Sequence, residues 1–181
     1  LTNNEKDTLP RLATDKKLDA EFVIDTAQRR IVESKTKAET VIIDINKKNG
    51  DDFEAYIVEK LNPKYFKIKQ WQGDKYADGR YAESNLNPDI IIEFSLGRNT
   101  STFAIECKWR KDLYKGGLEI TDDDQLDRYR KFERESGNKV FVAVGLGNEG
   151  SSPARLFIIP LSKVKGSFMA IDYLATFEKN E

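Results

Sequence analysis

Two short apolar runs rich in β-branched residues stand out in the middle of the chain. The first extends from Pro88 to Ser95 and the second from Ser101 to Trp109, and a short loop with Gly97 and Asn99 joins them. Apolar runs of this length flanking a glycine-containing loop are typical of two neighbouring strands in a β-hairpin. The pattern therefore predicts a hairpin over residues 88–109.

Three further stretches have the pattern of a strand. Residues 64–71 alternate polar and apolar side chains, which predicts the first core strand. Residues 139–146 are apolar on both faces, so we expect a central strand covered by a layer on each side. Residues 154–160 predict the last strand, and the mixed tail from 161 to 181 is expected to cover an edge of the sheet.

The helical pattern dominates the first third of the chain. Between Asp15 and Lys48, apolar residues recur every seven positions, at Ile24, Ile31, Ala38 and Ile45. We expect one or two helices that pack on the domain. A dimerising coiled coil, which would give a homodimer through this N-terminal helix, is an alternative, and a strand over residues 41–45 is another.

Two further helices are expected after this segment. The run Lys47-Lys48-Asn49-Gly50 is expected to break the first pattern, so that Asp51 begins a new helix ending before Pro63. Thr121 is expected to cap a helix over residues 122–135. The helices and strands together predict a helical N-terminal extension over residues 1–49 and an α/β domain over residues 50–181.

Composition narrows the classes of function. The 181 residues contain no histidine, one cysteine and a formal net charge of −1. The lack of histidine excludes His-based zinc sites and Ser-His-Asp hydrolases, and the single cysteine excludes an intrachain disulfide. A cytoplasmic, prokaryotic location is expected. Because the chain begins at Leu1, membrane contact is expected only if an upstream segment supplies an anchor.

Charged residues inside the predicted hairpin need a physical reason, because charges in a sheet are costly unless they are paired or bind a metal. Glu106 and Lys108 share one face of their strand, Cys107 points to the other, and Asp89 opens the first strand. The hairpin can bring Asp89, Glu106 and Lys108 together. Two carboxylates offer the oxygen ligands that Mg²⁺ prefers, and a neighbouring lysine can orient a metal-bound water.

Pro88-Asp89, followed after sixteen residues by Glu106-Cys107-Lys108, resembles the motif of the PD-(D/E)XK nuclease superfamily. The resemblance runs from about Gly50 to Pro160. It implies a three-layer α/β/α restriction-endonuclease-like core with a mixed sheet, and a Mg²⁺-dependent nuclease, with Mn²⁺ as a substitute, that cleaves DNA. Asp89, Glu106 and the carbonyl of Cys107 would hold the metal, and Lys108 would orient the attacking water.

Two more segments resemble parts of this superfamily. Gly50-Asp51-Asp52-Phe53-Glu54 is similar to its Gly-x-x-Phe-Glu helix opening, which implies a site role for Glu54. Gln125 and Tyr129 match the Gln-x-x-x-Tyr element of the recombination-exonuclease branch, which implies that both face the site and DNA. The alternatives are a capping box for Glu54, a boundary residue for Gln125 and a core aromatic for Tyr129.

The sequence indicates further charged residues that could contact metal or DNA. Glu93 falls on the face of Asp89, as a second site carboxylate or as a surface residue. Arg110, Lys111 and Lys115 form a basic loop expected to contact DNA phosphates near Lys108. Lys75, Tyr76, Arg80 and Tyr81 in the loop over residues 72–87 suit phosphates and stacked bases, or form a solvated loop.

The near-neutral charge keeps a second class of function open. A catalytically silent module on a nuclease-like fold would bind nucleic acid or a protein partner. A third hypothesis is a regulatory or membrane-tethered subunit, if the seven-residue repeat of the N-terminal helix dimerises and an upstream segment is missing.

Overall fold

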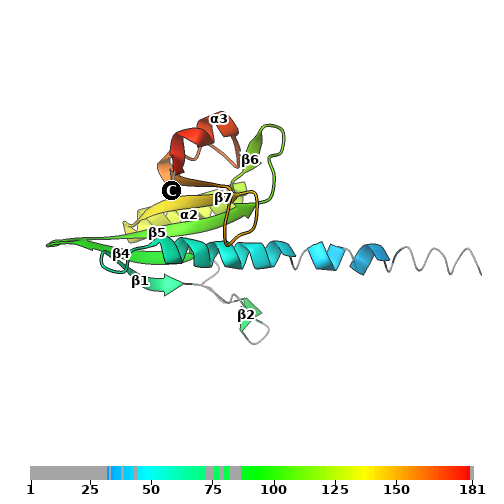
Figure 1. Ribbon diagram of the computed structural model, residues 1–181. Coiled ribbons are helices and arrows are strands. Elements are labelled where there is room, and N and C mark those ends of the chain that lie inside the picture. Colours follow the sequence, from blue (N-terminus) through cyan, green and yellow to red (C-terminus); the bar gives the residue numbers. More distant parts are fainter. Residues whose placement is uncertain are drawn as a thin grey trace, which may run out of the picture. The chain divides into compact units, whose positions relative to one another are not determined.

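A computed structural model describes residues 32, 34–37, 39–42, 45–71, 76–77, 80–81 and 87–179 (Figure 1). The chain divides into two compact units, Leu1–Asn46 and Lys47–Glu181. In the first unit the described residues are helical, so the alternative of a strand over residues 41–45 is wrong. Val32, Val41, Ile42 and Ile45 are exposed on this helix. Ile24, Ile31 and Ala38 lie outside the described residues, and the homodimer stays a prediction.

The second unit is built around one mixed sheet. Within the described residues it has six strands in the order β1-β4-β5-β7-β8-β10. The pairs β1–β4, β4–β5, β7–β8 and β8–β10 are antiparallel, whereas β5 and β7 run parallel. The bounds are β1 Phe66–Trp71, β4 Ile90–Leu96, β5 Asn99–Arg110, β7 Lys139–Leu146, β8 Arg155–Pro160 and β10 Glu178–Lys179.

Smaller elements complete the unit. The described residues contain two short two-stranded ladders, β2 (Tyr76–Ala77) with β3 (Arg80–Tyr81), and β6 (Gly117–Glu119) with β9 (Phe168–Ala170). The helices after the first strand are α2 (Asp123–Ser136) and α3 (Ile171–Leu174), with 3₁₀ turns at Leu161–Lys163 and Ala175–Phe177. No described helix combines the length and the apolar character that crossing a lipid bilayer requires.

The predicted hairpin is confirmed as β4 and β5. Ile92 pairs with Phe103, and the strands turn at Gly97, whose positive φ of 63° suits a residue without a Cβ. The parallel pair β5–β7 needs a crossover, and α2 supplies it. The hairpin and the crossover therefore fix the two central strands next to each other.

Apolar side chains on the two faces of the sheet form two separate cores. Phe53 and Ile57, from the helical residues 47–60, pack on Ile90, Ile105 and neighbouring side chains of one face. Leu126 and Tyr129 of α2 pack with β7 and β8 on the other face. The predicted three-layer α/β/α architecture with a mixed sheet is therefore confirmed.

The predicted helix break at residues 47–50 is wrong. Residues 45–60 are helical without interruption, so Gly50 lies inside the helix and Asp51 does not begin one. Glycine costs only about 1 kcal/mol in a helix interior. Tertiary contacts outweigh this cost: Asn49 Oδ1 accepts a hydrogen bond from the Gly150 amide at 2.9 Å, and Phe53 is fully buried.

One other expectation, in the second half of the chain, needs correction. Asp122, rather than Thr121, caps α2, because its carboxylate accepts a hydrogen bond from the Gln125 amide at 2.6 Å. The β6–β9 ladder was not predicted, since strands of three residues carry too little pattern. The expected cover of a sheet edge by the tail is confirmed, as β10 pairs with β8 and Leu174 is buried.

Two glycines give opposite predictions for stability. A Cβ on Gly145 of β7 would lie 2.5 Å from the Phe53 ring, whereas a Cβ on Gly50 would meet nothing within 4 Å. We expect Gly145→Ala to destabilise the protein by about 1–3 kcal/mol through overpacking. The matched control Gly50→Ala should stabilise it by about 0.5–1 kcal/mol. Urea unfolding measures both, and equal effects of one sign would contradict the packing described.

Candidate functional site

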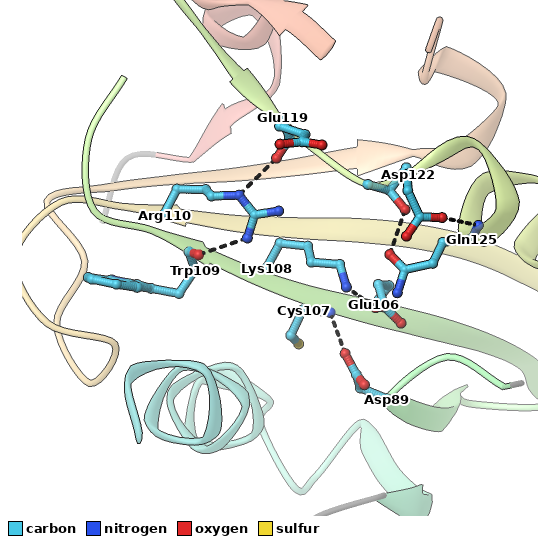
Figure 2. Close-up of polar contacts among 10 residues, drawn as sticks. Asp89, Glu106, Cys107, Lys108, Trp109, Arg110, Glu119, Asp122 and Gln125 are labelled. Atoms are coloured by element: carbon cyan, nitrogen blue, oxygen red, sulfur yellow. Dashed lines mark hydrogen bonds and ion pairs between the residues drawn. The ribbon is translucent and has the colours of Figure 1, made fainter. Parts of the chain in front are cut away.

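The hairpin places two carboxylates side by side at the end of β4. Because Ile90 pairs with Ile105, Asp89 lies beside Glu106 on the neighbouring strand. Asp89 Oδ2 accepts a hydrogen bond from the Cys107 amide at 2.9 Å (Figure 2). Each of the two carboxylic residues is 3% exposed. Two acidic side chains are thus buried together, as the sequence predicts.

Lys108 completes the group on the same face of β5. Its Nζ lies 2.7 Å from Glu106 Oε1, in an ion pair with little solvent access. The Cys107 side chain points to the opposite face, where it packs in the core with Phe53 and Ile57. Burial raises the pKa of the Cys107 thiol, so the thiol stays protonated and its main chain alone faces the carboxylates.

Helix α2 contributes two residues one turn apart. The Tyr129 hydroxyl donates a hydrogen bond to the Glu106 carboxylate, and Tyr129 is 4% exposed. Gln125 is directed toward Glu106 and Lys108, and its Oε1 accepts a hydrogen bond from the Thr121 hydroxyl at 2.9 Å (Figure 2). Since this bond occupies the amide oxygen, the Gln125 NH₂ group is left to donate toward the site.

The burial of two neighbouring carboxylates changes the pKa of Glu106. Burial and the neighbouring Asp89 raise the pKa of Glu106, while Lys108 and the Tyr129 hydroxyl act in the opposite direction. Burial and Glu106 together raise the pKa of Tyr129. Tyr129 therefore remains a hydrogen-bond donor at any ordinary pH.

Glu54 reaches the neighbourhood of the site from the helix on the other face of the sheet. It is 8% exposed, and its Oε2 accepts a hydrogen bond from Trp71 Nε1 at 3.2 Å. Its charge acts on the Cys107 thiol, which places it close to the strand that carries Glu106. No pattern in the sequence indicates that Trp71 orients Glu54, because the two residues come from different elements.

Glu93 does not join the carboxylate pair. It lies four residues from Asp89 along β4, about 13 Å by strand geometry. Its Oε2 forms an ion pair with Lys69 Nζ at 3.2 Å, at a partly exposed position. The structure therefore favours the surface alternative for this residue.

The three basic residues after Lys108 are placed differently from one another. Arg110 lies on the face of Glu106 and Lys108, and its Nε donates to the Glu119 carbonyl at 2.9 Å (Figure 2). A second bond joins its guanidinium to the Trp109 carbonyl at 3.0 Å. Lys111 and Lys115 are exposed. The side chains of Lys75, Tyr76, Arg80 and Tyr81 lie outside the described residues.

The donor set fits a hard cation. Asp89 and Glu106 offer carboxylate oxygens, and the Cys107 carbonyl is the further oxygen that the sequence motif suggests. A divalent cation beside them would offset the like charges that raise the pKa of Glu106. Among the described residues, no three acidic or cysteine side chains gather closely enough to hold a metal by themselves. Any metal here would need main-chain, water or substrate ligands as well.

Comparisons with known proteins add a remote structural likeness. No protein-family model matches the chain, and no curated protein matches it. Among solved structures, the chain is similar to Hjc, a Holliday junction resolvase from Archaeoglobus fulgidus, with a TM-score of 0.48 and 21% sequence identity. The alignment covers 68% of this chain and 90% of that chain.

The raised pKa of Glu106 predicts how stability depends on pH. In the metal-free protein, Glu106 is charged above its raised folded pKa, and its repulsion with Asp89 then destabilises the fold; below its unfolded pKa this repulsion is absent. Asp89→Asn keeps an oxygen acceptor for the Cys107 amide. We expect it to stabilise the protein by about 1 kcal/mol near pH ~8, and much less near pH ~4.

Thermal unfolding in a chelator at both pH values measures this effect. Glu93→Gln, which removes a carboxylate from a partly exposed ion pair, serves as the control and should change stability by less than about 1 kcal/mol. An equal effect of Asp89→Asn at both pH values would show that the two carboxylates do not interact.

Proposed function

We propose that this chain is a Mg²⁺-dependent nuclease that hydrolyses DNA phosphodiester bonds. The observation that carries the proposal is the group formed by Asp89, Glu106 and Lys108 on one face of the sheet. Two buried carboxylates beside an ammonium group are costly for folding, so a structural purpose does not account for them. Perturbed ionisable groups of this kind are characteristic of catalytic sites.

Asp89, Glu106 and the Cys107 carbonyl would hold the metal. When bound, Mg²⁺ polarises the phosphate and lowers the pKa of a bound water. Asp89 is oriented by the Cys107 amide, and Glu106 by Lys108 and the Tyr129 hydroxyl. These bonds fix both carboxylates before a substrate arrives, which is the preorganisation that catalysis by electrostatics requires.

The remaining site residues would act on the water and the substrate. Lys108 would orient the attacking water and stabilise the negative charge that develops on the phosphate. Gln125 would donate its NH₂ group to a substrate oxygen, since Thr121 holds its amide oxygen. Glu54 would support the metal or its waters from the other side. Lys111 and Lys115 would contact backbone phosphates without reading sequence.

A plasmid-cleavage assay with Mg²⁺ tests the proposal. We expect Asp89→Ala and Lys108→Ala each to lower cleavage by at least about 100-fold, because each removes a group that acts on the transition state. Lys131→Ala is the matched control, since Lys131 is exposed on α2 and pairs with Glu135 at 3.8 Å. Undiminished Mg²⁺-dependent cleavage by both site variants would refute the assignment.

A catalytically silent module that binds nucleic acid or a protein partner is the second candidate. The observation that favours it is the formal net charge of −1, which gives the chain no overall electrostatic attraction to DNA. Calorimetric titration with Mg²⁺ or Mn²⁺, with and without DNA, separates the two candidates. The nuclease predicts binding that Asp89→Asn weakens, whereas a silent module predicts no heat of binding at millimolar metal.

A further inference from the structure

An exposed aromatic surface lies beyond the end of β5, and the carboxylate site does not use it. Tyr114 is 65% exposed and Phe168 is 45% exposed, although large aromatic side chains of a folded unit are usually covered. The first belongs to the loop that follows the Lys108 strand, and the second opens β9. We call the surface formed by these two residues the aromatic face.

Backbone pairing places both rings on one side of a small ladder. Tyr114 and Gly117 exchange two hydrogen bonds, of 2.9 and 3.0 Å, so their Cβ directions lie on the same face. A Cβ on Gly117 would lie 2.5 Å from the Phe168 ring. The Phe168 ring therefore occupies the face toward which Tyr114 points, and Gly117 leaves the room for it.

The loop that carries this face is held in a defined conformation. Lys115 and Gly116 both have positive φ, 48° and 74°, as the tight turn between Tyr114 and Gly117 requires. The Gly116 carbonyl accepts a hydrogen bond from the Ile171 amide at 2.9 Å, and β6 pairs with β9. The aromatic face is therefore rigid while its rings remain exposed.

Positive charge lies beside the Tyr114 ring. Residues 110–117 carry three cationic side chains and one anionic side chain, in a chain whose formal net charge is −1. Lys115 Nζ lies 5.1 Å from the centroid of the Tyr114 ring. Glu119 shares the face, and its charge acts on Arg110. Aromatic rings bordered by cations match the bases and phosphates of a polynucleotide.

The aromatic face is joined directly to the strand that carries the carboxylate site. Arg110 lies two residues from Lys108, about 7 Å along β5. Its Nε donates to the Glu119 carbonyl, which ties the end of β5 to the end of β6. Figure 1 shows β6 and its loop rising from the end of β5 toward α3. The loop that carries the rings therefore begins at the same end of β5 as Lys108.

We propose that Tyr114 and Phe168 stack on unpaired bases of a single-stranded DNA segment next to the carboxylate site, with Lys111 and Lys115 on its phosphates. The inference rests on the proposed function for its choice of DNA as the partner. Paired bases in a duplex stack on each other, so their planes are not accessible to protein side chains. The aromatic face therefore selects single-stranded or unpaired regions.

Binding of a labelled thymidine oligonucleotide of about a dozen residues, in a chelator so that no cleavage occurs, tests the inference. We expect fluorescence anisotropy to show about 10-fold weaker binding for Tyr114→Ala and for Phe168→Ala. Tyr114→Phe should bind as the parent does, because stacking needs the ring and not the hydroxyl. Leu96→Ala, which removes another exposed apolar side chain at the β4–β5 turn, is the matched control and should have no effect.

Two further readouts separate stacking from a structural effect. A 2-aminopurine base in the oligonucleotide should lose fluorescence on binding to the parent protein and to Tyr114→Phe, and should lose less with Tyr114→Ala. Affinity for a blunt duplex should change less than twofold in Tyr114→Ala. Unchanged oligonucleotide affinity in both alanine variants, or Tyr114-dependent binding to phosphatidylserine vesicles without binding to the oligonucleotide, would overturn the inference.

The outcome is independent of catalysis. If the parent protein cleaves plasmid DNA but both alanine variants bind the oligonucleotide normally, the aromatic face is rejected and the nuclease stands. If the parent binds the oligonucleotide through Tyr114 but cleaves nothing with Mg²⁺ or Mn²⁺, the nuclease is rejected and the aromatic face stands.

Discussion

The candidate site depends on the burial of two like charges at the end of a hairpin. Asp89 and Glu106 are almost fully buried, and each has a specific polar partner, the Cys107 amide for the first and Lys108 for the second. Such partners reduce the cost of burial without removing it, since the pKa of Glu106 remains raised. This arrangement lowers the free energy of unfolding, which is a common property of active sites.

The surrounding fold supplies the stiffness that holds the charges in place. The helical residues 47–60 and α2 cover opposite faces of the sheet, and each delivers one polar side chain toward the central strand, Glu54 from one side and Tyr129 from the other. Because β4, β5 and β7 are hydrogen-bonded to one another, the site stands on regular structure rather than on loops. Side chains on helices and strands are held in position more precisely than side chains on loops.

The sequence predicts elements where apolar residues form a continuous run over several positions. The strand over residues 139–146 and the hairpin over residues 88–109 are predicted for this reason, and the hairpin also predicts the convergence of Asp89, Glu106 and Lys108. Sequence patterns do not predict structure that depends on contacts between distant residues. Gly50 predicts a helix break, yet the Asn49–Gly150 hydrogen bond and the burial of Phe53 keep the helix intact. The links Trp71–Glu54 and Arg110–Glu119 have no signature in sequence, because they join separate elements.

The central claim is that Asp89 and Glu106 share a divalent cation. The most direct measurement is anomalous X-ray scattering from crystals soaked in Mn²⁺. The account predicts a peak within coordination distance, roughly 2–2.5 Å, of oxygens from both carboxylates. It also predicts that the peak disappears in Asp89→Asn crystals. A peak at another site, or none at millimolar Mn²⁺ with both carboxylates ordered, would contradict it.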